Sequence, residues 1–179
     1  MANPSPSRLW VMRAAYLGLS LLILFFHLLP LDTVPRHWAP PDLLIALTFA
    51  WAMRRPDFVP SAAIALVMLT ADLLLHRPPG LLAALVVGGA AWLKADRAGL
   101  SEASFLGEWV SVGLVLIVIA IANRLLLGLT AVEQAPFWLT VIQLVLTIAV
   151  YPLVVLVSQL LFGVRRLAPS EAEAMGARS

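Results

Sequence analysis

Six apolar stretches separated by short polar segments account for most of the chain. An apolar helix of about 20 residues crosses the ~30 Å hydrocarbon core of a bilayer. The pattern therefore predicts an all-α integral membrane protein, with a six-helix transmembrane domain over residues 1–164 and a disordered cytoplasmic tail over 165–179. The expected spans cover residues 9–29, 43–53, 58–75, 80–93, 105–127 and 137–162.

The second expected span is short and is bounded by charged residues. Its 11 uncharged residues, 43–53, form roughly 16 Å of helix at about 1.5 Å per residue. Asp42 follows two prolines and is a good N-cap, whereas Arg54 and Arg55 suit the C-terminus of a helix. A proline then ends this helix, and Asp57 is expected to cap the third one, which is long enough to cross the bilayer.

Composition supports membrane insertion, and the basic residues predict its orientation. The chain is 61% hydrophobic and only 12% charged, whereas soluble domains contain about 25% charged residues. Six spans with both termini in the cytoplasm leave two basic residues, Arg36 and Arg77, in outside loops. The cytoplasmic segments then hold nine: Arg8, Arg13, Arg54, Arg55, Lys94, Arg97, Arg165, Arg166 and Arg178.

Three ionisable residues, His27, Asp72 and Arg124, fall within the expected spans, in the outer third of the bilayer. Such residues are costly in a membrane and usually have a partner or a function. We expect Asp72 to pair with Arg124 or Arg77 beneath the outer surface. Two interpretations of this polar cluster stay open: it holds the bundle together, or it lines a pocket open to the outside.

Two positions in the last two spans have structural interpretations. Glu108 lies one turn into the fifth span, where we expect it at the cytoplasmic interface, capping the helix or paired with Lys94 or Arg97. A proton relay is the alternative interpretation of Glu108. Tyr151–Pro152 predicts a kink in the sixth span, because proline interrupts the helical hydrogen bonds.

The sequence contains no motif that predicts catalysis or a cofactor. It lacks a nucleophile elbow, a phosphate-binding loop and an HExxH pattern, and it has no cysteine. The three histidines, His27, His37 and His76, are too scattered to predict a metal site. A net charge of +2 is too small to indicate nucleic-acid binding.

Two further groups of residues are candidates for contacts with a partner. Ala84, Gly88 and Gly89 in the fourth span are small, so that another helix could approach closely, either inside the bundle or from outside it. Arg54, Arg55 and Asp57 form a candidate cytoplasmic contact. The alternative for these charges is a role in topology and in binding anionic lipids.

The segments PDLLIALTFAWAMRRPD (41–57) and ADLLLHRPPGL (71–81) resemble the rod shape-determining protein MreD family. The detailed resemblance covers about 40 residues, and the remainder agrees in hydropathy and length. It implies a bacterial inner-membrane subunit of the cell-elongation (rod) complex, with MreC as partner and with links to MreB, RodA and penicillin-binding protein 2. It also implies a fold similar to the substrate-binding subunits of energy-coupling-factor transporters.

The sequence and the resemblance together favour a non-catalytic scaffold that connects the cytoskeleton to peptidoglycan synthesis and regulates cell shape. In this interpretation the partner's single transmembrane helix binds at the small-residue face. The main alternative is a small-molecule-binding membrane subunit of a vitamin-type transporter, with an outward pocket. A lipid-embedded assembly factor is a third option.

Overall fold

The computed structural model describes residues 6–29, 39–95, 105–130 and 134–164, and every regular element in these ranges is a helix. The α-helices are α1 (Pro6–Leu28), α2 (Leu43–Arg54), α3 (Ser61–Leu74), α4 (Leu81–Ala95), α6 (Phe105–Leu129) and α7 (Phe137–Phe162), and a 3-10 helix, η1 (Pro56–Phe58), joins α2 to α3. The all-α prediction therefore agrees with the described residues. The expected tail, 165–179, lies outside them.

Three helices, α1, α6 and α7, are long and apolar enough to cross a membrane, whereas α2, α3 and α4 are shorter apolar helices. The expectation that residues 58–75 form one continuous helix is wrong. Pro60 is the N-cap of α3, so the helix begins only at Ser61 and contains 14 residues. A helix of that length is about 21 Å long, which is shorter than the hydrocarbon core.

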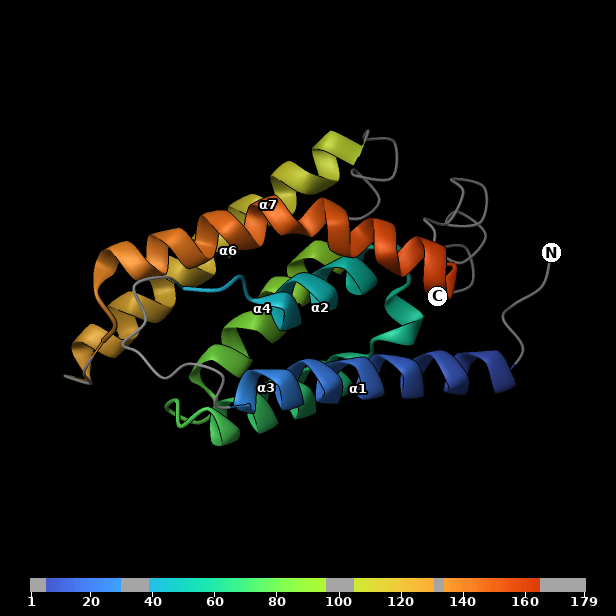
Figure 1. The fold of residues 1–179 in the computed structure, drawn as a ribbon, viewed down its shortest axis with the longest axis horizontal. Helices are drawn as coiled ribbons and strands as arrows, with labels where there is room; N and C mark the ends of the chain where they lie inside the picture. The colour runs from blue at the N-terminus through green and yellow to red at the C-terminus, as the bar shows by residue number, and fades with distance from the viewer. Residues whose placement is uncertain (1–5, 30–38, 96–104, 131–133, 165–179) are drawn as a thin grey trace.

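The helices form three layers (Figure 1). α6 and α7 lie together on one side, α1 and α3 lie together on the other, and the short α2 and α4 lie between them. Helix α2 packs against α7, α4 and α1. Helix α4 packs against α2 and also against α3 and α6. This arrangement buries α2 almost completely, whereas α4 keeps one exposed side.

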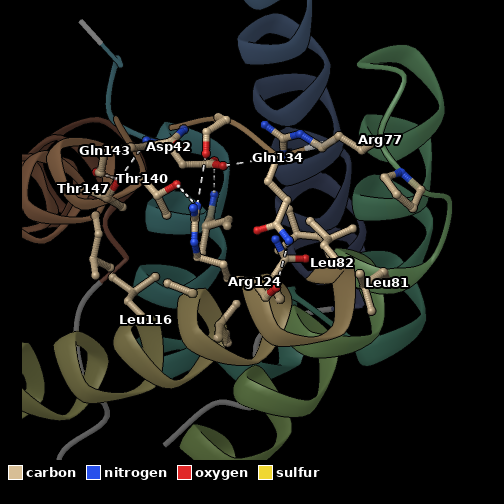
Figure 2. Close-up of a pocket in the computed structure, with 18 of the residues that line it drawn as sticks. Asp42, Arg77, Leu81, Leu82, Leu116, Arg124, Gln134, Thr140, Gln143 and Thr147 are labelled. Atoms are coloured by element: carbon tan, nitrogen blue, oxygen red, sulfur yellow. Dashed lines mark hydrogen bonds and ion pairs between the residues drawn. The ribbon is translucent and has the colours of Figure 1, made fainter. Parts of the chain in front are cut away.

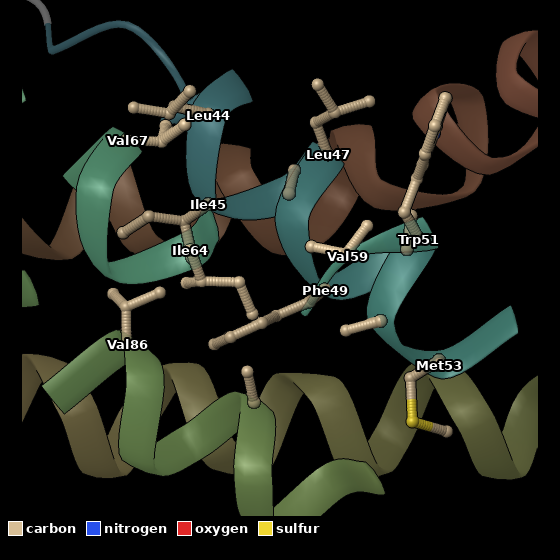
Figure 3. Packing of buried hydrophobic residues seen from close by; sticks show 14 of the residues in the cluster. Leu44, Ile45, Leu47, Phe49, Trp51, Met53, Val59, Ile64, Val67 and Val86 are labelled. Carbon is tan, nitrogen blue, oxygen red and sulfur yellow. The ribbon is translucent and has the colours of Figure 1, made fainter. Parts of the chain in front are cut away.

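The core of the bundle is centred on α2, in which every residue from Leu44 to Arg54 is buried. A helix that is apolar on all sides is stable only when neighbours surround it. Its aromatic side chains Phe49 and Trp51 reach residues of other helices, as Figure 3 shows. The Trp51 indole donates a hydrogen bond to Ser158 Oγ on α7 (3.1 Å), and its ring packs against Phe162.

The outer faces of the long helices are apolar and exposed. Large hydrophobic side chains are exposed on α1, α6 and α7, including Leu21, Phe25, Val118, Leu125, Leu160 and Leu161. Continuous apolar surface of this kind is unfavourable in water and suits contact with lipid tails or with other transmembrane helices. The long apolar helices and their exposed faces together indicate a helical membrane protein.

Helix α7 continues through Pro152, where the sequence predicts a kink. Proline has no backbone N–H, so the carbonyl of Ile148, four residues earlier, loses its helical partner. The indole of Trp109 on α6 donates a hydrogen bond to that carbonyl (2.8 Å). A neighbouring helix therefore satisfies the carbonyl group that Pro152 leaves unpaired.

Candidate functional site

A buried charged cluster joins the end of α2 to α6 and α7. Arg54 Nε and Nη2 donate to the two carboxylate oxygens of Glu108 (3.2 and 3.3 Å), and the Tyr151 hydroxyl donates to Glu108 Oε1 (2.7 Å). Arg54 is 4% exposed, and Glu108 and Tyr151 are fully buried. The two hydrogen bonds between the charged groups and the additional bond from Tyr151 offset the free-energy cost of removing both charges from water.

This cluster corrects two expectations about the charged residues. Glu108 is buried within the bundle and pairs with Arg54 rather than with Lys94, whose ammonium donates to the Val59 carbonyl instead (2.6 Å). The alternative partner, Arg97, lies outside the described residues. Arg54 is buried and is therefore unavailable for the cytoplasmic contact predicted for it. Pairing across helices depends on how each helix is rotated, which hydropathy does not encode.

The other two residues of the predicted cytoplasmic contact, Arg55 and Asp57, are half-buried at the turn between α2 and α3. The guanidinium of Arg55 lies over the ring of Phe58, at 5.8 Å from its centroid. The expected capping of α3 by Asp57 is wrong, because the N-cap is Pro60 and no side chain caps this helix. The Asp57 carbonyl accepts a hydrogen bond from Arg13 Nε of α1 (3.1 Å).

Asp72 is fully buried and does not pair with an arginine, in contrast to the prediction. Its Oδ2 accepts hydrogen bonds from the backbone N–H groups of Gly80 (3.1 Å) and Ala83 (3.3 Å), at the start of α4. A carboxylate at this position satisfies amides that have no helical partner and interacts favourably with the helix dipole. Asp72 therefore connects the end of α3 to the beginning of α4.

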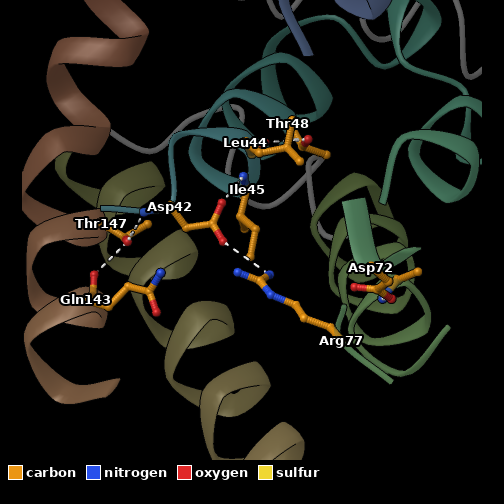
Figure 4. Close-up of polar contacts among 9 residues, drawn as sticks. Asp42, Leu44, Ile45, Thr48, Asp72, Arg77, Gln143 and Thr147 are labelled. Atoms are coloured by element: carbon orange, nitrogen blue, oxygen red, sulfur yellow. Dashed lines mark hydrogen bonds and ion pairs between the residues drawn. The ribbon is translucent and has the colours of Figure 1, made fainter. Parts of the chain in front are cut away.

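The arginines expected near Asp72 have other partners. Arg77 Nη1 lies 4.0 Å from Asp42 Oδ2, and Figure 4 shows its guanidinium directed toward Asp42 rather than Asp72. Arg124 Nη1 donates to the Ala135 carbonyl (3.1 Å) and to Thr140 Oγ1 (3.3 Å), and its guanidinium lies over the ring of Phe137. The predicted polar cluster is therefore divided into two parts.

One part surrounds a small cavity of about 20 Å³, lined by His27, Asp72 and Arg77 among others. Within the described ranges, Asp72 Oδ1 has no hydrogen-bond partner. A polar cavity of this size is sufficient for one water molecule. His27 and Asp72 therefore do approach the same cavity, as the prediction of a common cluster requires.

The other part is a larger cavity of about 400 Å³ at the N-terminal end of α2. Its lining combines Asp42, Arg77 and Arg124 with neutral polar groups, including Gln134, Thr140 and Gln143, and with leucines of α4 and α6. In Figure 2 most labelled polar side chains lie across the upper part of the view, and Arg124 lies in the middle, between Leu116 on one side and Leu81 and Leu82 on the other. The mixed lining suits a ligand with a polar group and an apolar part.

Asp42 fixes one edge of this larger cavity, and its capping role agrees with the sequence prediction. Its Oδ1 accepts a hydrogen bond from the Ile45 N–H (3.1 Å), and its own N–H donates to Thr147 Oγ1 of α7 (2.9 Å). Only the first of these contacts could be predicted, because it lies within three residues of Asp42. The contact with Thr147 joins residues that are far apart in the sequence.

The three small residues of α4 do not share a face. A Cβ atom on Gly89 would lie 2.8 Å from Val115 Cγ1 and 2.9 Å from Ile119 Cδ1, so Gly89 packs inside the bundle against α6. Ala84 and Gly88 are exposed, and a Cβ on Gly88 would meet no atom within 4 Å. The predicted partner-helix face is therefore wrong for Gly89 and remains available for Ala84 and Gly88.

The described part of the chain contains no group of three or more histidine, cysteine, aspartate or glutamate residues that could hold a metal ion. His76 is exposed and lines the larger cavity, and His37 lies outside the described residues.

Comparison with known proteins does not extend these conclusions. The chain matches no protein-family model, and the searches of curated proteins and of solved structures also find no match. The fold and the apolar surfaces indicate its class, a helical membrane protein with a cavity of mixed polar and apolar lining beside its central helix.

Proposed function

We propose that this protein is a non-catalytic scaffold subunit of MreD type in the bacterial cell-elongation complex. The observation that carries the proposal is the position of residues 41–57, the segment with the principal resemblance. This segment forms the buried central helix α2, which is capped by Asp42, bound to α6 through Arg54 and bound to α7 through Trp51. A rigid core surrounded by exposed apolar helices suits a protein that acts through lateral contacts.

In this proposal the chain crosses the bacterial inner membrane six times and has both termini in the cytoplasm. It binds MreC directly and, through the larger complex, connects to MreB, RodA and penicillin-binding protein 2. Arg55 and Asp57 remain candidates for a cytoplasmic contact because both are partly exposed. The excess of basic residues in the segments assigned to the cytoplasm supports this orientation.

The proposed docking face for the partner's single transmembrane helix is the exposed side of α4 at Ala84 and Gly88. Small residues allow close approach of two helix backbones, which strengthens van der Waals packing in lipid. The open surroundings of Gly88 support this assignment. Gly89, which packs inside the bundle, is excluded from the docking face.

Purification of the tagged chain in a mild detergent, followed by mass spectrometry, tests the scaffold function. We expect a single-span wall-elongation protein to co-purify, and Gly88→Leu to reduce its recovery at least about tenfold, because a large side chain separates the two helices. Gly18→Leu on α1 is the matched control, since a Cβ there also meets no atom within 4 Å. Equal recovery with both variants would exclude the α4 face, and recovery of no such protein would contradict the scaffold.

The cavity of about 400 Å³ favours a second candidate function, a small-molecule-binding membrane subunit. Its volume lies within the range of about 300–1,000 Å³ that is usual for ligand sites. Co-purification of ATPase subunits together with a bound small molecule would favour this function over the scaffold.

A further inference from the structure

The larger cavity exists because α2 is shorter than the helices beside it. The N-terminal residue of α2 is Leu43, and Asp42 bonds to Thr147, which lies ten residues after the start of α7. The first turns of α7 and the last turns of α6 therefore continue beyond the end of α2. The cavity is located between these turns and the connection from α3 to α4.

The charges that line this cavity favour an anion. Among the described residues that line it, two guanidinium groups, of Arg77 and Arg124, and one carboxylate, of Asp42, give a net charge of +1. Asp42 also interacts with the N-terminus of α2, where its Oδ1 accepts from the Ile45 N–H. Its separation from Arg77 is 4.0 Å, too long for a strong hydrogen bond. The pair therefore leaves Arg77 able to bind another acceptor.

Arg124 is also suited to bind an anion. Its hydrogen bonds to protein leave from Nη1 and end on two neutral acceptors, the Ala135 carbonyl and the Thr140 hydroxyl. These contacts, and the position of the guanidinium over Phe137, orient the side chain without neutralising its charge. Arginine binds carboxylate and phosphate groups through paired hydrogen bonds, so a group of this type fits the site.

The remaining wall is apolar. Leu81 and Leu82 of α4, Leu116 and Ile119 of α6, and Leu144 of α7 line the same cavity. These side chains cannot hydrogen-bond a polar ligand, and burial of an alkyl group against them is favourable. A ligand that satisfies both walls has an anionic end and an apolar body.

We propose that this cavity binds an amphiphile whose phosphate or carboxylate head group is held by Arg77 and Arg124 and whose apolar body packs against Leu82, Leu116 and Ile119. The site lies apart from the Ala84 and Gly88 face, so it is independent of the scaffold proposal. It deepens the second candidate function by specifying the chemical class of the ligand. A membrane lipid and a soluble metabolite are both sources of this chemistry.

Calorimetric titration of the purified full-length chain in phosphatidylcholine nanodiscs tests the site, with protein-free nanodiscs as the blank. The probe is n-octyl phosphate, and the comparison compounds are octyltrimethylammonium and octyl glucoside, which carry the same alkyl chain. We expect saturable binding of octyl phosphate and at least about tenfold weaker binding of the other two, because charged hydrogen bonds distinguish them.

Four variants locate the binding. Arg77→Gln and Arg124→Gln are each expected to weaken octyl phosphate binding at least about tenfold. Leu82→Trp is expected to abolish binding by filling the cavity without changing its charge. Arg8→Gln is the matched control, since Arg8 is exposed on the first turns of α1 and does not line the cavity. Circular dichroism establishes that each variant folds. The preference for octyl phosphate over the other two octyl compounds is measured on the unaltered chain, so this part of the test does not depend on the folding of any variant.

Each outcome supports or overturns the proposal. Loss of octyl phosphate binding when phosphatidylglycerol is added to the nanodiscs identifies a lipid head-group site, and competition by inorganic phosphate identifies a soluble anion. Equal binding of all three octyl compounds, lost in Leu82→Trp, overturns the anionic assignment but preserves small-molecule binding. Unchanged affinity in folded arginine variants overturns the assignment of the two arginines. Absence of saturable binding by any probe overturns both the site and the second candidate function.

Discussion

At the scale of single residues, the most consequential arrangement is the cluster of Arg54, Glu108 and Tyr151. Removing two charges from water has a free-energy cost of several kcal/mol per ion, about as large as the attraction between them. The cluster is stable because both carboxylate oxygens of Glu108 accept from the guanidinium and one also accepts from Tyr151. Loss of Arg54 or Glu108 leaves the charge of the other buried without a counter-charge.

Glu108→Gln is therefore expected to lower the free energy of unfolding by about 3–5 kcal/mol, because the charge of Arg54 then stays buried without a counter-charge. The measurement is detergent-induced unfolding of the purified protein. The pair variant Arg54→Met with Glu108→Leu should recover much of the loss, because neither buried charge remains.

The matched control for this prediction is Arg55→Gln. Arg55 is the neighbouring arginine, but it is half-buried, and its described contact is with the Phe58 ring. The expected loss of stability is below about 1 kcal/mol. Similar losses for Glu108→Gln and Arg55→Gln would show that the buried pair is not a major source of stability.

At the scale of elements, the contact between α6 and α7 depends on a defect in α7. Pro152 leaves the Ile148 carbonyl without its helical donor, and the Trp109 indole of α6 supplies a replacement. The adjacent Tyr151 bonds to Glu108, which precedes Trp109. Two consecutive residues of α6 therefore bind to the segment of α7 around the proline, and this contact fixes the relative rotation of the two helices.

Trp109→Phe is expected to destabilise the protein by about 1–3 kcal/mol, since the partly buried Ile148 carbonyl then lacks a donor. In a Pro152→Ala background the same change should have a smaller effect, because the backbone N–H that alanine restores at this position can pair with the Ile148 carbonyl. A double-mutant cycle, followed by unfolding in detergent, measures this difference. Additive effects of the two substitutions would show that Trp109 does not compensate for the proline.

At the scale of the whole molecule, the short helices α2 and α4 lie between two outer layers, one formed by α6 and α7 and the other by α1 and the short α3. α2, α3 and α4 contain 12, 14 and 15 residues, and each is shorter than the hydrocarbon core. The packing of α2 and α4 between the outer layers, and of α3 against α1 and α4, supports the proposal that these three helices cross the membrane despite their length. The same difference in length leaves space for the cavity at the N-terminus of α2.

The absence of cysteine allows a direct test of the six-span topology with single cysteines and a membrane-impermeant maleimide in intact cells. Substitutions at Thr33, His76 and Glu133 are expected to be labelled, and those at Asp57 and Ser101 only after permeabilisation. If only the three long helices crossed, Asp57→Cys and Ser101→Cys would be labelled in intact cells and Glu133→Cys would not.

The sequence by itself determined the features that depend on neighbouring residues. Apolar length located the six α-helices of the described residues, and the predicted last span, 137–162, agrees with α7 at both ends. The capping role of Asp42 was predictable for the same reason, because the carboxylate and the amide that donates to it lie three residues apart. The break at Pro60 was also encoded locally, but the hydrophobicity of residues 58–75 outweighed it in the prediction.

Only the tertiary structure decided which partners the charged and small residues have. Asp72 binds the start of α4 rather than an arginine, and Glu108 binds Arg54 rather than Lys94. Gly88 and Gly89 are adjacent in sequence, but one is exposed and the other packs against α6. These outcomes depend on the rotation and neighbours of each helix, which are set by packing summed over the whole bundle and not by any local pattern.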